Sequence, residues 1–192
     1  MNSKDMSEIR WHARAGQGAV TAAKMLAETA LKEGLFIQAF PEYGPERQGA
    51  PLRAFNRISS KPIRIRSTSV NPDVVVILDE TLLKSGVDLL EGTTNGTIIL
   101  VNSNREPEAV ARELNALDRK VFTVDATHIA LENFGRPFPN TPMLGALVKV
   151  AGIVKLDNVL EELREFMGKK FGSQVVNGNV EAAKRAYEEV KG

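Results

Sequence analysis

Apolar residues along the chain alternate between strand-like and helix-like spacing. Ile9, Trp11 and Ala13 are apolar at every second position, which predicts a short first strand. The spacing then becomes helical, which predicts a helix over residues 19–33. We expect the apolar face of this helix to comprise Val20, Ala23, Ala27, Ala30 and Leu31. Gly34 follows, and we expect it to end the helix as a C-terminal cap.

Three shorter apolar segments predict further strands and a hairpin. Residues 35–40 form the first of these segments. Residues 52–58 and 63–65 form the other two, separated by a Ser-Ser-Lys-Pro turn at residues 59–62. Because a crossover helix does not fit between strands so close in sequence, we expect residues 52–58 and 63–65 to form an antiparallel hairpin attached to the main sheet.

A continuous aliphatic run predicts a central strand. Residues 74–78 contain only valine, isoleucine and leucine, which is the pattern of a strand covered on both faces in a parallel sheet. Residues 97–101 and 121–124 repeat this pattern more weakly, and a helix that begins near Pro107 separates them. We expect the apolar face of that helix to comprise Val110, Leu114 and Leu117.

Helical patterns dominate after Ala126. Two late helices are expected from their apolar faces, which comprise Val159, Leu163 and Phe166 in one and Val180, Ala183, Tyr187 and Val190 in the other. Strands and helices that alternate in this way predict the α/β class. We therefore expect a single domain over residues 1–192, with a mostly parallel sheet, helices on both faces and the antiparallel hairpin as an addition.

Composition narrows the classes of protein. With no cysteine among 192 residues, the chain has no disulfide, no thiolate zinc site and no cysteine-ligated iron–sulfur cluster. Lysine plus arginine (25) nearly balances aspartate plus glutamate (24), so we expect no nucleic-acid partner. The first ten residues lack an apolar stretch, and the run 74–78 is far shorter than a membrane span. We expect a cytoplasmic protein without a membrane partner.

A glycine turn is the first candidate binding site. Gly16, Gln17 and Gly18 lie between the first predicted strand and the first helix. Glycines there bring backbone N–H groups close to a ligand, and the helix N-terminus favours a phosphate or carboxylate. Thr21 occupies the place of the third small residue of a dinucleotide fingerprint, and no Gly-Lys-Ser/Thr follows as in a phosphate-binding P-loop. An ordinary glycine turn in a βα connection remains the alternative.

A loop rich in proline and charge is the second candidate. Residues 41–51 contain two glutamates, a tyrosine, an arginine, a glutamine and three prolines. The prolines restrict the backbone and reduce the entropy lost on ordering. Arg47 suits a bidentate contact with a phosphate or carboxylate, although Glu42 or Glu46 can pair with it instead. A rigid surface loop with an internal ion pair is the alternative.

Polar residues at predicted strand ends have structural interpretations. Asp79 and Asn102 follow strands, as does Asp125, and ligands of open parallel sheets bind at such ends. We favour Asp79 as a helix cap. Asn140 and Thr141, before Pro142, have the chemistry of a cap and first turn for a helix over residues 143–154. The histidines, His12 and His128, lack metal-ligand spacing, and no Gly-x-Ser-x-Gly sequence exists.

Four segments together carry a resemblance to a known family. They are Ala15-Gly16-Gln17-Gly18, the loop Phe40 to Gly49, the strand Asp73 to Asp79, and Asn140 to Ala146. In these segments and their order the chain resembles the gamma subunit of 2-oxoacid:ferredoxin oxidoreductases, most closely the pyruvate ferredoxin oxidoreductase (pyruvate synthase) group. The resemblance extends from about Ile9 to about Gly172. The sequence PEYGPERQG at residues 41–49 is its most specific part.

The resemblance implies that the subunits of the enzyme have different roles. In this family the whole enzyme cleaves a 2-oxoacid oxidatively, reduces ferredoxin and forms acyl-coenzyme A and carbon dioxide. Partner subunits of alpha, beta and delta type carry thiamine diphosphate, magnesium and the iron–sulfur clusters. The gamma subunit packs on the thiamine-binding subunits and helps to receive coenzyme A (CoA), so we expect it to bind no cofactor alone and to hold no catalytic residue.

On these segments we propose candidate contact residues. They are Gly16, Gln17, Gly18, Glu42, Tyr43, Arg47, Gln48, Asn140 and Thr141. The Gly16–Gly18 amides and Arg47 are expected to face an anionic group, such as a CoA phosphate, while Glu42, Tyr43 and Gln48 shape the loop against the catalytic subunits. A purely structural subunit and an independent nucleotide-binding module are the alternatives.

Overall fold

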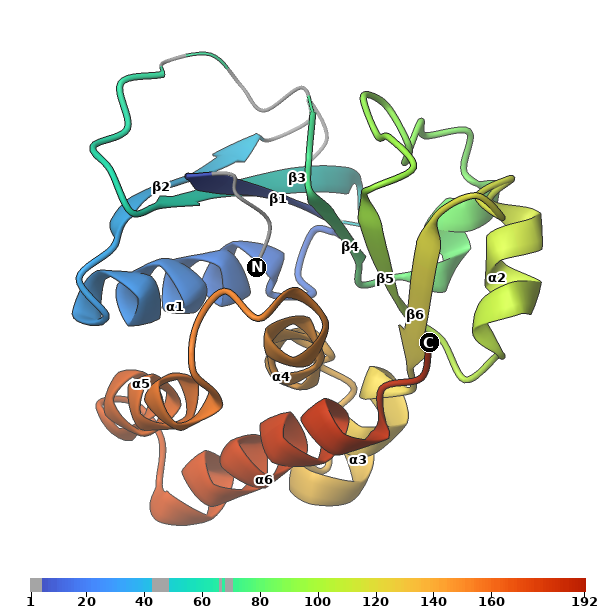
Figure 1. Cartoon of the computed structure of the whole chain (residues 1–192). Coiled ribbons are helices and arrows are strands. Elements are labelled where there is room, and N and C mark those ends of the chain that lie inside the picture. The colour runs from blue at the N-terminus through green and yellow to red at the C-terminus, as the bar shows by residue number, and fades with distance from the viewer. Residues whose placement is uncertain (1–4, 43–48, 66, 68–70) are drawn as a thin grey trace.

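The computed structural model describes residues 5–42, 49–65, 67 and 71–192. Within these residues six strands form one mixed sheet in the order β2-β3-β1-β4-β5-β6 (Figure 1). The strands are β1 (Met6–Arg14), β2 (Phe36–Glu42), β3 (Pro51–Ser59), β4 (Val74–Ile77), β5 (Ile98–Asn102) and β6 (Lys120–Val124). The pairs β1–β4, β4–β5 and β5–β6 are parallel, whereas β1–β3 and β2–β3 are antiparallel. The predicted α/β fold with a mostly parallel sheet is confirmed.

The predicted hairpin is wrong in its partner. Residues 63–65 are not a strand; instead β3 pairs with β1 on one side and β2 on the other. The nine residues of β3 match the nine of β1 along their whole length, from Met6↔Ser59 to Arg14↔Pro51. Residues 63–65 cannot pair with β3, because both edges of β3 are already occupied by β1 and β2. The predicted loop over 41–51 is shorter, because β2 extends to Glu42 and β3 begins at Pro51.

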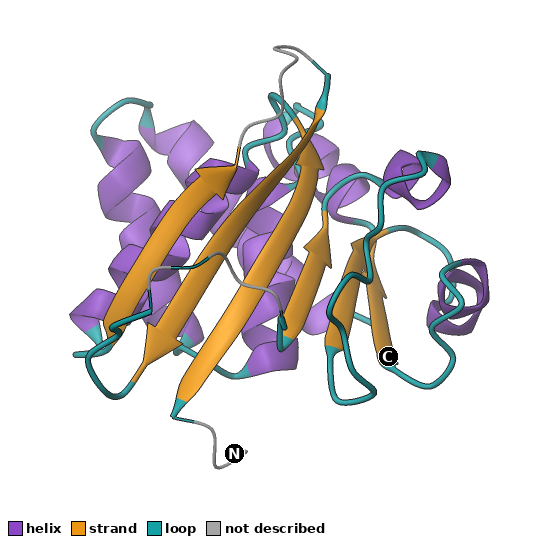
Figure 2. Cartoon of the chain, turned by 90° about the horizontal axis from the view of Figure 1, so that it is seen from above, coloured by secondary structure: helices purple, strands orange, loops and turns teal. Residues whose placement is uncertain are grey.

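Helices cover both faces of the sheet, as predicted. Among the described residues they are α1 (Ala19–Lys32), α2 (Pro107–Glu113), α3 (Ala126–Phe134), α4 (Asn140–Ala151), α5 (Leu156–Gly168), α6 (Ser173–Glu189) and a 3₁₀ helix η1 (Glu80–Lys84). Figure 2 looks onto the sheet and shows its single twisted layer with most helices behind it. Helices α1 and α4 pack directly on that face, and α6 packs outside them against α3, α4 and α5 (Figure 1).

The alternating sides of the strands form two apolar clusters. Val74 and Val76 of β4 join the larger cluster beneath α1 and α4, together with Ile9, Trp11 and Ala13 of β1. Val75 and Ile77 join the smaller one, together with Leu82 of η1 and Val110 of α2. All four residues of β4 are buried, as the aliphatic run predicts.

Helix α1 is terminated by Gly34, as the sequence predicts. Gly34 has φ 79° and ends α1 in a Schellman arrangement, in which the N–H groups of Gly34 and Leu35 donate to the carbonyls of Leu31 and Ala30.

The predicted burial of two leucines is wrong: Leu31 is 54% exposed and Leu117 is 68% exposed. Both lie at the end of a helical pattern, beyond the reach of the sheet. Among the described residues, none of the helices has the length and apolarity required to cross a membrane.

Helix α4 begins three residues before the predicted position. Pro139 occupies the N-cap, without a side-chain hydrogen bond, and Asn140 and Thr141 are already helical. The interpretation of Asn140 as the cap of a helix over 143–154 is therefore wrong. The reason is that Pro139 sets its own φ near the helical value (−77°), so the helix starts without a polar cap. Because Asn140 is not the cap, its side-chain amide is available for a different contact.

Candidate functional site

The glycine turn lies between β1 and α1 at the carboxyl end of β1. Gly16 and Gly18 both have positive φ, 100° and 83°, which explains the need for glycine at these positions. Gly18 is the N-cap of α1 and offers no side chain, so the first N–H groups of a 14-residue helix have no side-chain acceptor. This turn therefore presents backbone donors and the positive end of a helix dipole.

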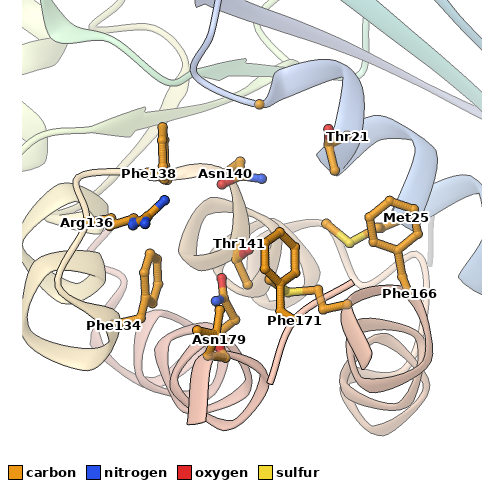
Figure 3. A pocket seen from close by; sticks show the side chains of 13 residues that line it. Thr21, Met25, Phe134, Arg136, Phe138, Asn140, Thr141, Phe166, Phe171 and Asn179 are labelled. Carbon is orange, nitrogen blue, oxygen red and sulfur yellow. Dashed lines mark hydrogen bonds between the residues drawn. The ribbon is translucent and has the colours of Figure 1, made fainter. Parts of the chain in front are cut away.

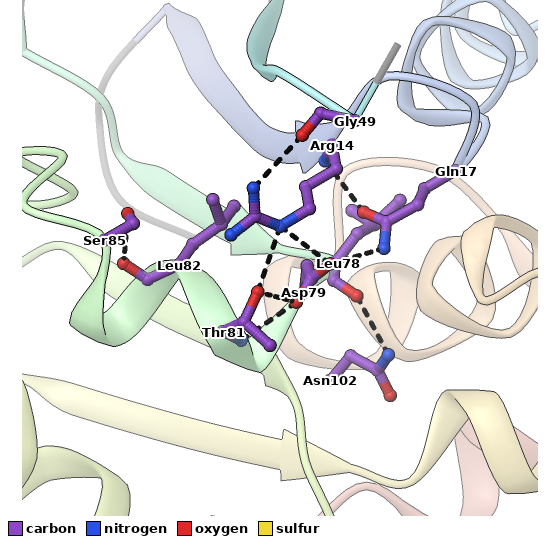
Figure 4. A network of polar contacts seen from close by, with 9 residues as sticks. All are labelled: Arg14, Gln17, Gly49, Leu78, Asp79, Thr81, Leu82, Ser85 and Asn102. Atoms are coloured by element: carbon purple, nitrogen blue, oxygen red, sulfur yellow. Dashed lines mark hydrogen bonds and ion pairs between the residues drawn. The ribbon is translucent and has the colours of Figure 1, made fainter.

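The side chain of Gln17 points into the protein. Its Oε1 accepts a hydrogen bond from Arg14 N at 2.8 Å, and its Nε2 donates to Asp79 Oδ2 at 2.7 Å (Figure 4). Asp79 caps η1, as predicted, by accepting from Thr81 N at 2.9 Å. Burial acts to raise the pKa of Asp79, but hydrogen bonds from Thr81 and Gln17 and the charge of Arg14 outweigh it and lower the pKa. Asp79 is therefore a carboxylate at neutral pH.

The proline-rich loop is described only at its ends. Glu42 ends β2, where it accepts from Arg53 Nε at 2.8 Å, and Arg53 Nη1 also donates to Glu91 at 2.9 Å. The carboxylate of Glu42 thus pairs with an arginine of the neighbouring strand. Tyr43, Arg47 and Gln48 lie outside the described residues.

A cavity of about 270 Å³ adjoins the glycine turn. Its walls come from α1, from the connection between α3 and α4, and from the junction of α5 with α6 (Figure 3). The apolar lining residues are Met25, Phe134, Phe138, Phe166, Met167, Phe171 and Val175, and the polar ones are Thr21, Arg136, Asn140, Thr141 and Asn179, with Gly18 at the edge. The cavity thus brings together three residues that the sequence predicted, Gly18, Asn140 and Thr141.

Unpaired polar groups face this cavity. Thr141 is only 2% exposed, and its side chain makes no hydrogen bond to another described residue. The side chains of Asn140 and Arg136 likewise have no partner within the described part of the chain. The N-terminus of α4, a 12-residue helix, lies beside that of α1, because a Cβ on Gly18 would fall 2.7 Å from Asn140 Nδ2. Two helix N-termini and these unpaired side chains thus surround one cavity with an aromatic lining.

Sequence reasoning missed Arg136 and the phenylalanines of this cavity. Arg136 and Phe138 lie in the sequence Phe-Gly-Arg-Pro-Phe-Pro, which connects α3 to α4. A glycine and two prolines around one arginine mark a loop that precedes a helix N-terminus, and this signal could have identified the segment. The contributions of Phe166 and Phe171 have no comparable signal, because they depend on how α5 and α6 pack against α1.

A second buried polar group lies on the opposite face of the sheet. His12 of β1 is 1% exposed, and its Nε2 has no hydrogen-bond partner among the described residues. Burial, followed by the charges of Arg10 and Arg53, lowers the pKa of His12 to about 3. The imidazole is therefore neutral at physiological pH and unsuited to general acid catalysis. No group of three potential metal ligands occurs in the described part of the chain.

Comparisons with known proteins identify relatives along almost the whole chain. The family model for pyruvate ferredoxin/flavodoxin oxidoreductase matches residues 8–189. The Thermotoga maritima protein named pyruvate synthase subunit PorC is 52% identical over 189 residues, which cover 98% of this chain and 97% of that protein. The pyruvate/ketoisovalerate oxidoreductases common subunit gamma of Thermococcus kodakarensis is 48% identical over 182 residues, 95% of this chain and 96% of that protein.

A solved structure agrees with the sequence comparisons. The crystal structure of pyruvate oxidoreductase subunit PORC from Thermotoga maritima matches with a TM-score of 0.87 and 48% identity, and the match covers 98% of each chain. The resemblance recognised in four short segments is therefore confirmed over the full length of the fold.

Proposed function

The chain belongs to the pyruvate ferredoxin/flavodoxin oxidoreductase family, and on this premise we propose that it is the gamma-type subunit of a pyruvate:ferredoxin oxidoreductase. Relatives that match almost end to end are subunits of pyruvate synthase and of related oxidoreductases. The reaction of the proposed complex converts pyruvate, CoA and oxidised ferredoxin to acetyl-CoA, carbon dioxide and reduced ferredoxin. Its other subunits, of alpha, beta and delta type, share the cytoplasm with this chain.

The electron-transfer centres do not fit this chain. Iron–sulfur clusters are held mainly by cysteine thiolates, and the sequence contains no cysteine. We therefore assign the clusters to the partner subunits, and we assign thiamine diphosphate and magnesium to them on the family resemblance. Glu42, Tyr43 and Gln48 are assigned to the surface that packs on the thiamine-binding subunits. No proton-transfer step is assigned to this chain.

We propose that this subunit contributes to binding CoA at the cavity beside the glycine turn. The observation that carries this proposal is the convergence of the N-termini of α1 and α4 on a cavity with unpaired polar groups. CoA carries phosphates and extended apolar and ring portions, and phosphates bind well at helix N-termini. The backbone N–H groups that follow Gly18 and the Arg136 guanidinium supply donors for a phosphate, with Arg47 as a further cation. Asn140 and Thr141 supply hydrogen bonds at the cavity wall, and the phenylalanines supply an apolar surface.

The test is the CoA KM of the assembled oxidoreductase after single substitutions in this subunit. Arg47→Ala, Arg136→Gln and Asn140→Ala each remove a proposed polar contact. The loss of a charge-assisted contact with phosphate costs about 1–3 kcal/mol, so we expect the CoA KM to rise about ten- to a hundredfold for the arginines. The KM for pyruvate is expected to remain unchanged.

Arg164→Gln is the matched control for Arg136→Gln. Arg164 is an exposed arginine of α5 outside the cavity, and it has no ion pair with a described residue. If all three cavity and loop variants assemble normally and keep the CoA KM of the control, the CoA contact is refuted. The chain is then a structural subunit whose loop serves only as an interface.

A further inference from the structure

Arg14 connects three segments at the carboxyl ends of β1 and β4. Its Nε donates a hydrogen bond to Thr81 Oγ1 at 3.0 Å and lies 3.4 Å from Asp79 Oδ2. Its Nη1 donates to the carbonyl oxygen of Gly49 at 3.1 Å. One guanidinium therefore joins the strand before the glycine turn to the start of η1 and to the far end of the proline-rich loop (Figure 4).

A second connection runs through the backbone. Ala15 N donates to the carbonyl oxygen of Ala50 at 2.9 Å, and Gln17 N donates to the carbonyl oxygen of Arg14 at 3.1 Å. The glycine turn is therefore closed on itself and attached to residues 49–50. These contacts hold the turn and this end of the loop at a fixed separation.

The polar groups of Gln17 and Asp79 are engaged with each other and with this arginine. Gln17 uses Oε1 to accept from Arg14 N and Nε2 to donate to Asp79. Asp79 additionally accepts from Thr81 N at 2.9 Å and from Thr81 Oγ1 at 2.6 Å. Since both polar ends of Gln17 are used inside the protein, its side chain is poorly placed to touch a ligand.

We propose that Arg14, Gln17 and Asp79 are positioning residues, a turn cluster that fixes the glycine turn against residues 49–50 so that its backbone donors are preorganised for CoA. Gln17 acts through Asp79 and Arg14, and the turn contributes its backbone to the ligand. This inference rests on the proposed CoA contact and adds to it the residues that preorganise the site. Preorganisation matters because a donor that must be ordered at binding loses part of its contribution to affinity.

The contact between Gln17 and Asp79 allows a test by exchange. Gln17→Glu places a second carboxylate 2.7 Å from Asp79, and Asp79→Asn removes the charge that balances Arg14 and the acceptor that Gln17 needs. The double variant Gln17→Glu, Asp79→Asn reverses the hydrogen bond and keeps one carboxylate beside Arg14. The hydrogen bond between positions 17 and 79 is then made in the opposite direction, and Thr81 keeps its acceptor at position 79, while an amide nitrogen takes the place of the oxygen 3.4 Å from Arg14 Nε.

The experiment compares both single variants, the double variant and a control in the assembled oxidoreductase. Asp157→Asn, at an exposed position of α5, is the control for loss of one carboxylate. The measurements are the KM values for CoA and for pyruvate, kcat, and hydrogen exchange in peptides that cover residues 13–18 and 49–55. We expect each single variant to raise the CoA KM about tenfold and to accelerate exchange in both peptides, with the pyruvate KM unchanged. The double variant is expected to restore both quantities to within about twofold.

The outcomes separate this inference from the proposed function. If the single variants raise the CoA KM and the double variant does not restore it, Gln17 touches CoA directly and the positioning role is overturned. If exchange in both peptides stays at the control rate in every variant, the turn cluster does not fix the turn and the inference is overturned. If exchange changes and recovers as expected but the CoA KM never moves, the cluster exists without a CoA site, and the proposed contact itself has failed.

Discussion

Gly18 lies directly against the side chain of Asn140, so that a Cβ on Gly18 would fall 2.7 Å from Asn140 Nδ2 and 2.8 Å from its Cγ. This contact joins the N-terminus of α1 to the first turn of α4 and forms one edge of the cavity. It explains why two glycines of the same turn have different tasks. Gly16 is also left-handed, but a Cβ there would meet no atom within 4 Å.

We expect Gly34→Ala and Gly18→Ala both to lower stability, and only Gly18→Ala to weaken CoA binding. Each puts an alanine at positive φ, which costs about 1–2 kcal/mol of the free energy of unfolding. Only Gly18→Ala displaces Asn140, and only it should raise the CoA KM of the assembled enzyme. Urea unfolding and CoA kinetics are the measurements, and Gly34→Ala, at φ 79° with no atom within 4 Å of a Cβ, is the control. Equal KM values for the two variants contradict a role for the Gly18–Asn140 contact in the site.

Gly145 shows that a recognised motif can serve packing. It lies in α4 within the segment Asn140 to Ala146, and a Cβ there would fall 2.0 Å from the carbonyl oxygen of Ala183 in α6. Because backbone cannot move aside as a side chain can, Gly145→Ala should force α4 and α6 apart. We expect a loss of at least about 2 kcal/mol in the free energy of unfolding, at the upper end of overpacking costs.

The control for Gly145→Ala is Gly168→Ala at the end of α5. A Cβ on Gly168 meets nothing within 4 Å, and its φ is not in the left-handed region. Alanine also has the better helix propensity, so this variant is expected to be neutral or slightly stabilising. Denaturant unfolding of both variants against the parent checks the difference. A Gly145→Ala variant as stable as Gly168→Ala shows that the helices separate without cost.

The sequence predicts those elements whose pattern depends on their own residues. The aliphatic run 74–78 reads as a doubly covered strand because β4 divides its side chains between the two clusters, Val74 in one and Val75 in the other. Gly34 and Asp79 behave as caps for reasons that lie within a few residues of each. These are local causes, and a sequence displays them directly.

The remaining elements depend on residues far apart in the chain. The partner of β3 is β1, whose residues lie about forty to fifty positions away, and no local signal distinguishes this pairing from the shorter hairpin that residues 63–65 suggest. The candidate site has the same character. Gly18, Asn140 and Phe166 meet only because α1, α4 and α5 pack together. The motifs therefore indicate that a site exists but not which residues line it. The apolar helical pattern extends to Leu31 and Leu117, but no other described part of the protein covers these two side chains, and both are exposed.

The outer face of β1 and β3 holds a buried ion pair that should be costly to break. Arg57 Nε donates to Glu8 Oε1 at 2.6 Å, and the side chain of Arg57 is 2% exposed. Removal of one partner leaves a buried charge without compensation, which typically costs about 3–5 kcal/mol. We expect Arg57→Ala to lower the free energy of unfolding by about 3 kcal/mol. The double variant Arg57→Met, Glu8→Gln should recover a large part of this loss, because no buried charge remains.

The pair Lys61–Asp5 is the matched control for Arg57–Glu8. It also has a distance of 2.6 Å, but its side chains are 69% and 60% exposed. Exposed pairs contribute little because water screens them, so Lys61→Ala should change the free energy of unfolding by about 0.5 kcal/mol or less. Urea unfolding of these variants measures the comparison. Similar losses for Arg57→Ala and Lys61→Ala contradict the assignment of Arg57 to a buried pair.

His12 should make the protein less stable in mild acid. Its pKa in the folded protein is about 3, whereas 6.5 is the ordinary value expected for the unfolded chain. Between these values the unfolded chain binds a proton that the folded protein does not, so stability rises with pH across this window and falls as pH decreases. The expected slope from this residue is about 1.4 kcal/mol per pH unit between about pH 6 and pH 4. Above pH 7 the contribution is constant.

The variant His12→Gln tests this slope, because glutamine fills similar space and does not titrate. The free energy of unfolding is measured by urea denaturation at several pH values between 4 and 7.5. Subtraction of the variant from the parent removes the contribution of carboxylates common to both, and the difference should change with the slope stated above. Imidazole NMR of the folded parent gives an independent reading, in which the His12 signal should not titrate above pH 4. A difference that stays constant with pH, or an imidazole that titrates near pH 6, means that Arg10, Arg53 and the burial of His12 do not suppress its protonation.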